Sequence, residues 1–514
     1  MKESKAYNVL RSTVTGLGNS VALLILNLLS RNLFLQYIGI DYLSVAQVIN
    51  NLLTVIAFSE LGLSNAVIYM LYKPVADGNT EKVIRIIYLY RKFNRYVGIA
   101  IAIIGLMVMP TLHLFIRTDV PYTTVQLIYL MNLFTSVASY FYTYRSIMLS
   151  VNQKDYINSI ISTIFSFVRV IIQCFIIYLT HDYILFLLTS IIATILQNAI
   201  IYYQTGKMYP YICNLTTVKN TGKLQQEKHE LKSNIMSMAT VKMTAIAINN
   251  TDIIIISWIN TILVGLCSNY MSISNYIKTF VMVFQNVLVH SIGISVNERN
   301  EEKRYELFKQ IHLINTFIAG IIFTCLAVLW NDFIVLWIGS AYLIDTPLFI
   351  SLLLNVSWGF MIATVWMFRD VMGLFNLVKY MLLIHTVINL IMSVVAGYFF
   401  GAAGVFFATV VADIITNFWY DSNIVFKKAF GKKNGLEYQL YVIESMFSAG
   451  LLSYLLINFF STWDINIFNW IIKLFISVIV YSIYFILRYN NTIAFKLLYK
   501  NYIKKFLYRF IKKG

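Results

Sequence analysis

Apolar residues dominate this chain in long runs that are separated by short polar breaks. An apolar run of about 20 residues crosses a bilayer as an α-helix, because the helix satisfies its own backbone polar groups. The alternation typical of barrel strands is absent from these runs. The pattern predicts an all-α integral membrane protein with about fourteen transmembrane helices, at 14–36, 43–70, 84–110, 123–147, 157–179, 183–205, 235–258, 264–294, 307–329, 346–367, 376–399, 402–424, 439–460 and 466–487.

Composition supports this interpretation. Of 514 residues, 59% are hydrophobic and 12% are charged, and the mean hydropathy is +0.70, which is more apolar than soluble domains. The first apolar run is too long for the core of a signal peptide, so we expect it to stay in the mature protein. The cysteines stand singly and indicate neither a disulfide framework nor a metal site; they are Cys174, Cys213, Cys267 and Cys325.

Positive charges occur in alternate loops. Lysine and arginine are frequent in 73–95, 207–232 and 427–433, which follow even-numbered spans, whereas the intervening loops carry aspartates and one clear cation, Arg117. Cytoplasmic loops are enriched in lysine and arginine. We therefore expect a multi-pass protein of the cell membrane with an even number of spans and both termini in the cytoplasm.

The longest polar stretch, 204–231, separates two sets of six spans. This predicts an N-terminal lobe at 1–205, a cytoplasmic linker at 206–234, a C-terminal lobe at 235–426, helices thirteen and fourteen at 427–488, and a basic amphipathic tail at 489–514. The tail is typical of a segment that binds anionic lipids, and nucleic acid is not an expected partner.

A weak internal match supports a duplicated transporter. The stretch that contains Arg31, Gly39 and Ser44 aligns at constant offset with the stretch that contains Asp252, Asn260 and Gly265. Internal repeats of this kind are common among secondary transporters.

Several ionisable residues fall inside the predicted spans, where each costs about 2.5–3.5 kcal/mol unless it is paired, hydrated or functional. The cations are Arg31, Arg169, Lys242, Lys278 and Lys473, and the acids are Glu60, Asp252 and Asp413. Spans one, seven and eight also carry polar faces, which suggest a shared hydrated cavity with surplus positive charge. Such a cavity favours an anionic group such as phosphate. The predicted substrate-binding residues are Asn27, Arg31, Arg169, Lys242, Asn249, Asp252, Asn275 and Lys278.

A purely structural alternative remains open at this point. Arg31 and Asp252 occupy equivalent places in the repeat and would neutralise each other, while the asparagines would join helices by hydrogen bonds. Likewise, Lys473 and Arg169 would pair with acids or extend to the interface.

No catalytic constellation is apparent. The six histidines are isolated, and there is neither a Walker sequence nor a cluster of metal ligands at the usual spacing. We expect a transporter rather than an enzyme, with no cofactor and with a coupling ion, H⁺ or Na⁺, left open.

Three short segments resemble a known family. They are ELGLSNA at 60–66 with LYKP at 71–74, FRDVMGLF at 368–375 and GAAGVFFAT at 401–409. In this order they resemble Wzx-like polysaccharide transporters of Gram-positive bacteria, in the multidrug/oligosaccharidyl-lipid/polysaccharide (MOP) exporter superfamily. The resemblance implies two six-helix bundles in a V with two extra C-terminal helices.

The same resemblance implies a flippase. Its substrate would be an undecaprenyl-pyrophosphate-linked oligosaccharide, which moves from the inner to the outer leaflet by alternating access for capsule, exopolysaccharide or teichoic-type polymer. The polysaccharide biosynthesis machinery would be a partner. Related flippases use arginines in the first cavity helices, which fits Arg31.

Two alternatives remain. A cation-coupled multidrug exporter of the same superfamily would use acidic residues to collect its substrate, whereas the intramembrane surplus here is basic. A membrane polysaccharide polymerase or ligase would need a sizeable outer loop, whereas the predicted outer loops are short.

The charge pattern generates a topology test. A cysteine placed after Gly514 should react with an impermeant maleimide only after the cells are permeabilised, because the basic loops hold both termini inside. A cysteine at Asp464, in a predicted outer loop, is the matched positive control. Labelling after Gly514 in intact cells would contradict the topology.

Overall fold

The computed structural model of the chain describes residues 22–57, 63–213, 224–225, 227–232, 250–297, 300–432 and 435–498. Within these ranges the chain is helical and contains no strand. The predicted all-α fold class is therefore confirmed.

The chain divides into two compact units, Met1–Gly265 and Leu266–Gly514. The first unit contains helices at 22–37 and Asn250–Ile259 and the elements α2 (Ile40–Ile56), α3 (Leu63–Ala76), α4 (Thr80–Val108), α5 (Leu112–Phe115), α6 (Tyr122–Tyr142), α7 (Ile147–Val151), α8 (Asp155–Thr180) and α9 (Tyr183–Met208). Short 3-10 turns lie at Met109–Thr111, Thr143–Arg145 and Pro210–Ile212.

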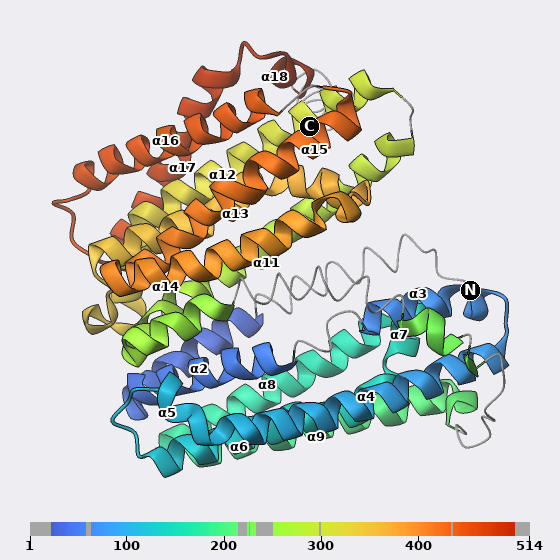
Figure 1. Cartoon of the computed structure of the whole chain (residues 1–514). Helices are drawn as coiled ribbons and strands as arrows, with labels where there is room; N and C mark the ends of the chain where they lie inside the picture. Colours follow the sequence, from blue (N-terminus) through green and yellow to red (C-terminus); the bar gives the residue numbers. More distant parts are fainter. Residues whose placement is uncertain are drawn as a thin grey trace, which may run out of the picture. The chain divides into compact units, whose positions relative to one another are not determined.

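The helix α11 (Thr261–Asn297) begins in the first unit and continues into the second, because the boundary falls after Gly265. The second unit also contains α12 (Glu301–Ile338), α13 (Thr346–Val371), α14 (Phe375–Asp413), the π-helix η7 (Ile414–Phe418), α15 (Trp419–Phe430), α16 (Leu436–Phe459), α17 (Ile467–Tyr489) and α18 (Ile493–Leu498), with a 3-10 turn at Ser340–Tyr342. These helices can be followed from yellow to red in Figure 1. The predicted lobe boundaries, which differ from this division, stay predictions.

All fourteen predicted spans fall on helical segments wherever the structure describes them. Eight helices in the described ranges are long and apolar enough to cross a membrane. The predicted span at 43–70 covers α2 up to its end at Ile56 and the first part of α3, and residues 58–62 between them lie outside the described residues. Of the predicted seventh span, only 250–258 is described.

A tight turn joins the eleventh and twelfth predicted spans within α14. Gly401 has φ 64° and ψ −154°, a conformation that side chains with a Cβ rarely adopt. A Cβ at Gly404 would lie 2.2 Å from the Ala396 carbonyl oxygen. Both glycines are therefore required by the turn.

The helix ends support the internal repeat. Gly39 and Asn260, which the sequence match pairs, directly precede α2 and α11. Ser44 and Gly265, a second matched pair, touch each other: a Cβ at Gly265 would lie 2.1 Å from Ser44 Oγ. The Ser44 hydroxyl also lies 3.5 Å from the Ile262 carbonyl oxygen. Only glycine at position 265 allows this close approach.

In the first unit, α4, α6, α9 and α8 pack in sequence as neighbours (Figure 1). A buried cluster at one end of this unit joins α3, α4 and α7 to part of the predicted linker, through Leu224 and Leu231. Glu227 accepts hydrogen bonds from Arg85 of α4, at 3.0 Å from Nε and 2.9 Å from Nη2. The linker is thus fastened to the first unit by apolar contacts and one bidentate ion pair.

In the second unit, α12 is the central helix and contacts α13, α15, α16 and α17. Gly320 makes this packing possible, because a Cβ there would lie 1.7 Å from the Tyr481 hydroxyl oxygen of α17. Tyr481 is 1% exposed. Helices thirteen and fourteen of the sequence prediction, α16 and α17, therefore pack directly on the C-terminal unit.

The linker contact can be tested by Glu227→Ala. Loss of a charge-assisted, bidentate contact should weaken the docking of 227–232 by about 1–3 kcal/mol, so trypsin should cleave faster after Lys228 and Lys232. Glu81→Ala is the matched control, because Glu81 lies 3.8 Å from the same arginine with its side chain 87% exposed. Equal cleavage rates in both variants would show that the ion pair does not hold the linker.

Candidate functional site

The first helix, 22–37, carries Asn27 and Arg31 on one face, one turn apart and both half-buried. Arg31 interacts with another residue, as does Asp252, which is 6% exposed in the helix Asn250–Ile259. Both belong to the first unit. The substrate-binding role of these residues stays a prediction.

The same first helix borders an apolar hollow of about 340 Å³ on its other side, against α8. The hollow is lined by Leu26, Leu29, Asn32, Leu33, Ile171, Cys174 and Phe175. Aromatic contacts continue this packing, with Phe34 edge-on to Tyr183 and Phe186 of α9. The helix thus combines a polar face that bears a cation with an apolar face, which is an arrangement that suits an amphiphilic ligand.

Arg169, on α8, is half-buried, and its Nε has no hydrogen-bond partner among the described residues. A guanidinium nitrogen that is shielded from water and left without an acceptor is unfavourable unless an anion approaches it. Arg169 is therefore the predicted cation for which the structure provides the clearest unfilled hydrogen bond.

The remaining predicted residues are distributed differently. Asn275 and Lys278 lie on α11 in the second unit, and both are exposed. Lys242 and Asn249 lie outside the described residues. The structure brings Asn27 and Arg31 together on one helix face, and whether the whole set lines one cavity stays a prediction.

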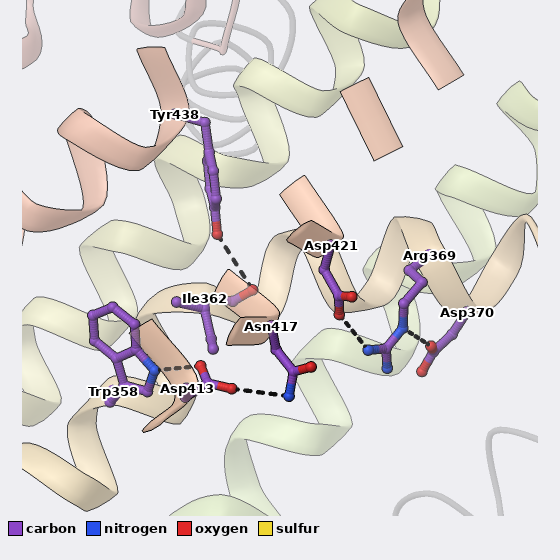
Figure 2. A network of polar contacts seen from close by, with 8 residues as sticks. All are labelled: Trp358, Ile362, Arg369, Asp370, Asp413, Asn417, Asp421 and Tyr438. Atoms are coloured by element: carbon purple, nitrogen blue, oxygen red, sulfur yellow. Dashed lines mark hydrogen bonds and ion pairs between the residues drawn. The ribbon is translucent and has the colours of Figure 1, made fainter. Parts of the chain in front are cut away.

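A second polar site lies buried in the C-terminal unit (Figure 2). Asp413 accepts hydrogen bonds from Trp358 Nε1 at 2.7 Å and from Asn417 Nδ2 at 3.2 Å. Four residues after Asn417, Asp421 pairs with Arg369 Nη1 at 2.6 Å. The Nε of the same arginine donates to Asp370 at 2.9 Å. We refer to these six residues as the α13–α15 network.

Local structure positions this network. Trp358, Arg369 and Asp370 come from α13, whereas Asp413, Asn417 and Asp421 follow at intervals of four through the end of α14, η7 and α15. That interval places side chains on one helix face. The segment 414–418 is a π-helix, a rare element that is frequent at functional sites.

Sequence reasoning identified only part of this network. Asp413 was recognisable as an acid within an apolar span, but Arg369 and Asp370 belong to the FRDVMGLF segment and were interpreted as loop residues. Instead, Arg369 is in the last turn of α13, with its side chain 12% exposed. The spacing of Asp413, Asn417 and Asp421 was a usable signal for the site.

An aromatic pocket of about 270 Å³ also lies in the second unit, between α12, α15, α16 and α18. Its lining includes Tyr305, Phe308, Tyr438 and Tyr441 together with Lys309. The Lys309 ammonium lies 4.4 Å from the centroid of the Tyr305 ring. None of the predicted site residues lines this pocket.

The described residues contain no group of side chains that could hold a metal ion, and all four cysteines are free thiols. His312 and His385 are buried and lie apart in the fold: His312 is surrounded by Phe308, Tyr438 and Tyr441, and His385 Nδ1 lies 2.8 Å from Thr416 Oγ1.

Lys473 has a structural role. Its ammonium lies 2.7 Å from Asp332 of α12, and the two side chains are 6% and 15% exposed. The adjacent Trp470 donates a hydrogen bond to the Leu329 carbonyl oxygen at 3.2 Å. Of the two alternatives for Lys473, pairing is therefore confirmed.

Solved structures share this fold. The lipid II flippase MurJ, in an inward closed conformation, is similar with a TM-score of 0.63 and 16% identity, over 92% of this chain and 98% of that chain. An inward-facing multidrug resistance MATE family transporter of the MOP superfamily is similar with a TM-score of 0.59 and 12% identity, over 82% and 95%. The sequence matches no family model and no curated protein.

The fold defines a class of protein: a multi-pass helical membrane protein that shares its architecture with a flippase and a multidrug transporter. More particularly, the chain has the MOP-superfamily fold shared by the flippase and the multidrug transporter, so the fold inferred from the sequence resemblance is confirmed. The Gram-positive branch and the orientation of the termini stay predictions.

The Lys473 pair can be tested with single and double changes. Lys473→Met or Asp332→Leu alone should destabilise the protein by roughly 3 kcal/mol, because breaking a buried pair leaves one uncompensated charge. The double variant should regain most of that loss, as measured by thermal unfolding in detergent. The control is Arg488→Ala, which removes the ion pair between Arg488 and Glu444. Both of these side chains are about half exposed, so this change should alter the stability little. A double variant as unstable as the singles would contradict the pairing role.

Proposed function

We propose that this chain is a flippase for undecaprenyl-pyrophosphate-linked oligosaccharides, which it moves from the inner to the outer leaflet by alternating access during capsule, exopolysaccharide or teichoic-type polymer assembly. The observation that carries the proposal is the likeness to the lipid II flippase over 92% of this chain. That protein is a flippase of lipid II. The transfer to a related lipid-linked sugar belongs to this proposal.

The chemistry of the first unit supports such a substrate. A sugar pyrophosphate cannot enter hydrocarbon unless the protein replaces its hydration. Arg31 and Arg169 offer guanidinium groups, which bind phosphate oxygens in a bidentate geometry. The apolar hollow beside the first helix offers a surface for an isoprenyl chain. Together these features match the two chemically different ends of the substrate.

The likeness to a multidrug transporter supports one competing function, the export of drugs. A drug exporter would collect cationic compounds on acidic groups, and the α13–α15 network contains buried carboxylates. Proteoliposomes distinguish the two functions directly. Translocation of a fluorescent undecaprenyl-pyrophosphate disaccharide without efflux of ethidium supports the flippase, and the reverse result supports the drug exporter.

Arg31 provides the residue-level test. Arg31→Ala should lower the flipping rate by about 10- to 100-fold, which corresponds to losing a charge-assisted hydrogen bond worth roughly 1.5–3 kcal/mol. Arg31→Lys should restore part of the rate, since an ammonium does not reproduce the bidentate contact. Lys303→Ala, which removes an exposed lysine of α12, is the matched charge control.

The structural alternative for Arg31 gives a different result. If Arg31 only neutralises Asp252, the double variant Arg31→Ala, Asp252→Ala should transport as well as the wild type while each single variant fails. Restored transport in the double variant would therefore exclude a substrate-binding role for Arg31. Persistent loss in the double variant, with normal protein levels in the membrane, would support it.

A further inference from the structure

The α13–α15 network contains one more buried negative charge than positive charge. Asp413 is 7% exposed and Asp421 is 1% exposed, and among the described residues the one guanidinium bound to either of them is that of Arg369. Asp370, the second partner of Arg369, has a side chain that is 49% exposed and is therefore hydrated. If both buried aspartates are ionised, the only buried cation of the six residues is Arg369 and one negative charge is left over within the network, which is unfavourable in a protein surrounded by lipid.

The hydrogen bonds of the network are incomplete at two specific atoms. Both oxygens of Asp413 receive a donor, from Trp358 and from Asn417. By contrast, Asp421 Oδ1 and Asn417 Oδ1 have no hydrogen-bond partner in the part of the chain that the structure describes. Asn417 is 4% exposed, so bulk water does not satisfy its oxygen. Two acceptors therefore lack a donor in the same network.

These two acceptors belong to neighbouring side chains. Asn417 and Asp421 are four residues apart, an interval that brings side chains together on a helix face. Figure 2 shows Asn417 between Asp413 and Asp421. A hydrogen on Asp421 Oδ1 would turn that oxygen into a donor, and Asn417 Oδ1, one helical turn away, is the acceptor of the network that lacks one.

We infer that the α13–α15 network is a proton-binding site, in which Asp421 carries the proton on Oδ1 and donates it to Asn417 Oδ1. One proton supplies the missing donor and also removes the uncompensated charge, so that Asp413 and Arg369 balance each other within the unit. Asp370 marks the exposed end of the network, from which water reaches Arg369 and its neighbours.

Other titratable groups face this site from each packed element. His385 of α14 lies against Thr416, whose hydroxyl donates to the Ala412 carbonyl oxygen and therefore accepts from His385 Nδ1. Tyr438 of α16 lies on the opposite side and donates to the Ile362 carbonyl oxygen at 3.4 Å. From α12, His312 contacts Tyr438 rather than the carboxylates.

A proton fits the available ligands better than a hard metal cation. Calcium takes six to eight oxygen ligands and magnesium requires octahedral coordination, whereas Asp421 Oδ1 and Asn417 Oδ1 are the two oxygens of the network that lack a donor. When Asp421 loses its proton, the excess charge falls at the contact between α13 and α15, which pack against each other.

The experiment uses infrared difference spectroscopy between low and high pH on the full chain in nanodiscs. The wild type should show the C=O band of a buried protonated carboxyl that disappears as the pH rises. Asp421→Asn should remove this band and should fold normally, because the amide supplies the same donor as the protonated acid. Asp421→Glu should keep a C=O band at a shifted position. A band in this variant would show that a substitution at position 421 does not itself unfold the site, so that the loss in Asp421→Asn reports the missing carboxyl.

Three further variants locate the proton. Asp370→Asn, the exposed control, and His385→Gln should leave the band in place, and Asp413→Asn should shift it without removing it. Thermal stability should fall with rising pH in the wild type and should change less in Asp421→Asn.

Persistence of the band in Asp421→Asn, its loss in His385→Gln, or its displacement by sodium at constant pH would overturn the assignment. The measurement requires no transport, so a failed flippase assay would not affect it, nor would its failure affect the proposed function.

Discussion

A charge that a helix carries into hydrocarbon must be paired, hydrated or neutralised, and much of this structure depends on that constraint. The protein meets it in several ways. Lys473 is paired across two helices with Asp332, and Arg85 is held by Glu227 near the linker. Arg369 is shared between one buried and one exposed carboxylate. Arg169 has an unfilled donor and Asp421 an unfilled acceptor, and these are the two positions at which we place a ligand.

These two unfilled positions carry opposite charge and lie in different units. The first unit offers guanidinium groups and an apolar hollow, which suit an anionic amphiphile. The second unit offers surplus carboxylate, which suits a proton. Under the proposed function, the site in the first unit would take the substrate and the site in the second unit would take a proton. The excess of lysine and arginine within the predicted spans would then concern substrate binding alone and not proton binding.

The helices could be predicted because hydropathy is a local property that depends on neighbouring residues alone. The end of α2 at Ile56 could not be predicted, since apolar residues stand on both sides of it and the stretch from 43 to 70 contains no proline. The Gly401 turn was recognisable from its glycines. The α13–α15 network was mostly missed because its residues come from two helices that are distant in sequence. Arg369 resembles an ordinary cation at a helix end until the position of Asp421 is known.

The contact of Ser44 with Gly265 has an evolutionary consequence. The two positions correspond in the internal repeat, so they descend from one residue of a shorter ancestor if the halves arose by duplication. Serine in both places would clash, since even a methyl group at 265 would lie 2.1 Å from the Ser44 hydroxyl oxygen. The two copies could therefore be identical here only with a residue as small as glycine. A pair of identical subunits would have met with two small residues at this point, and fusion into one chain allowed one copy to acquire a hydroxyl while the other kept a bare backbone.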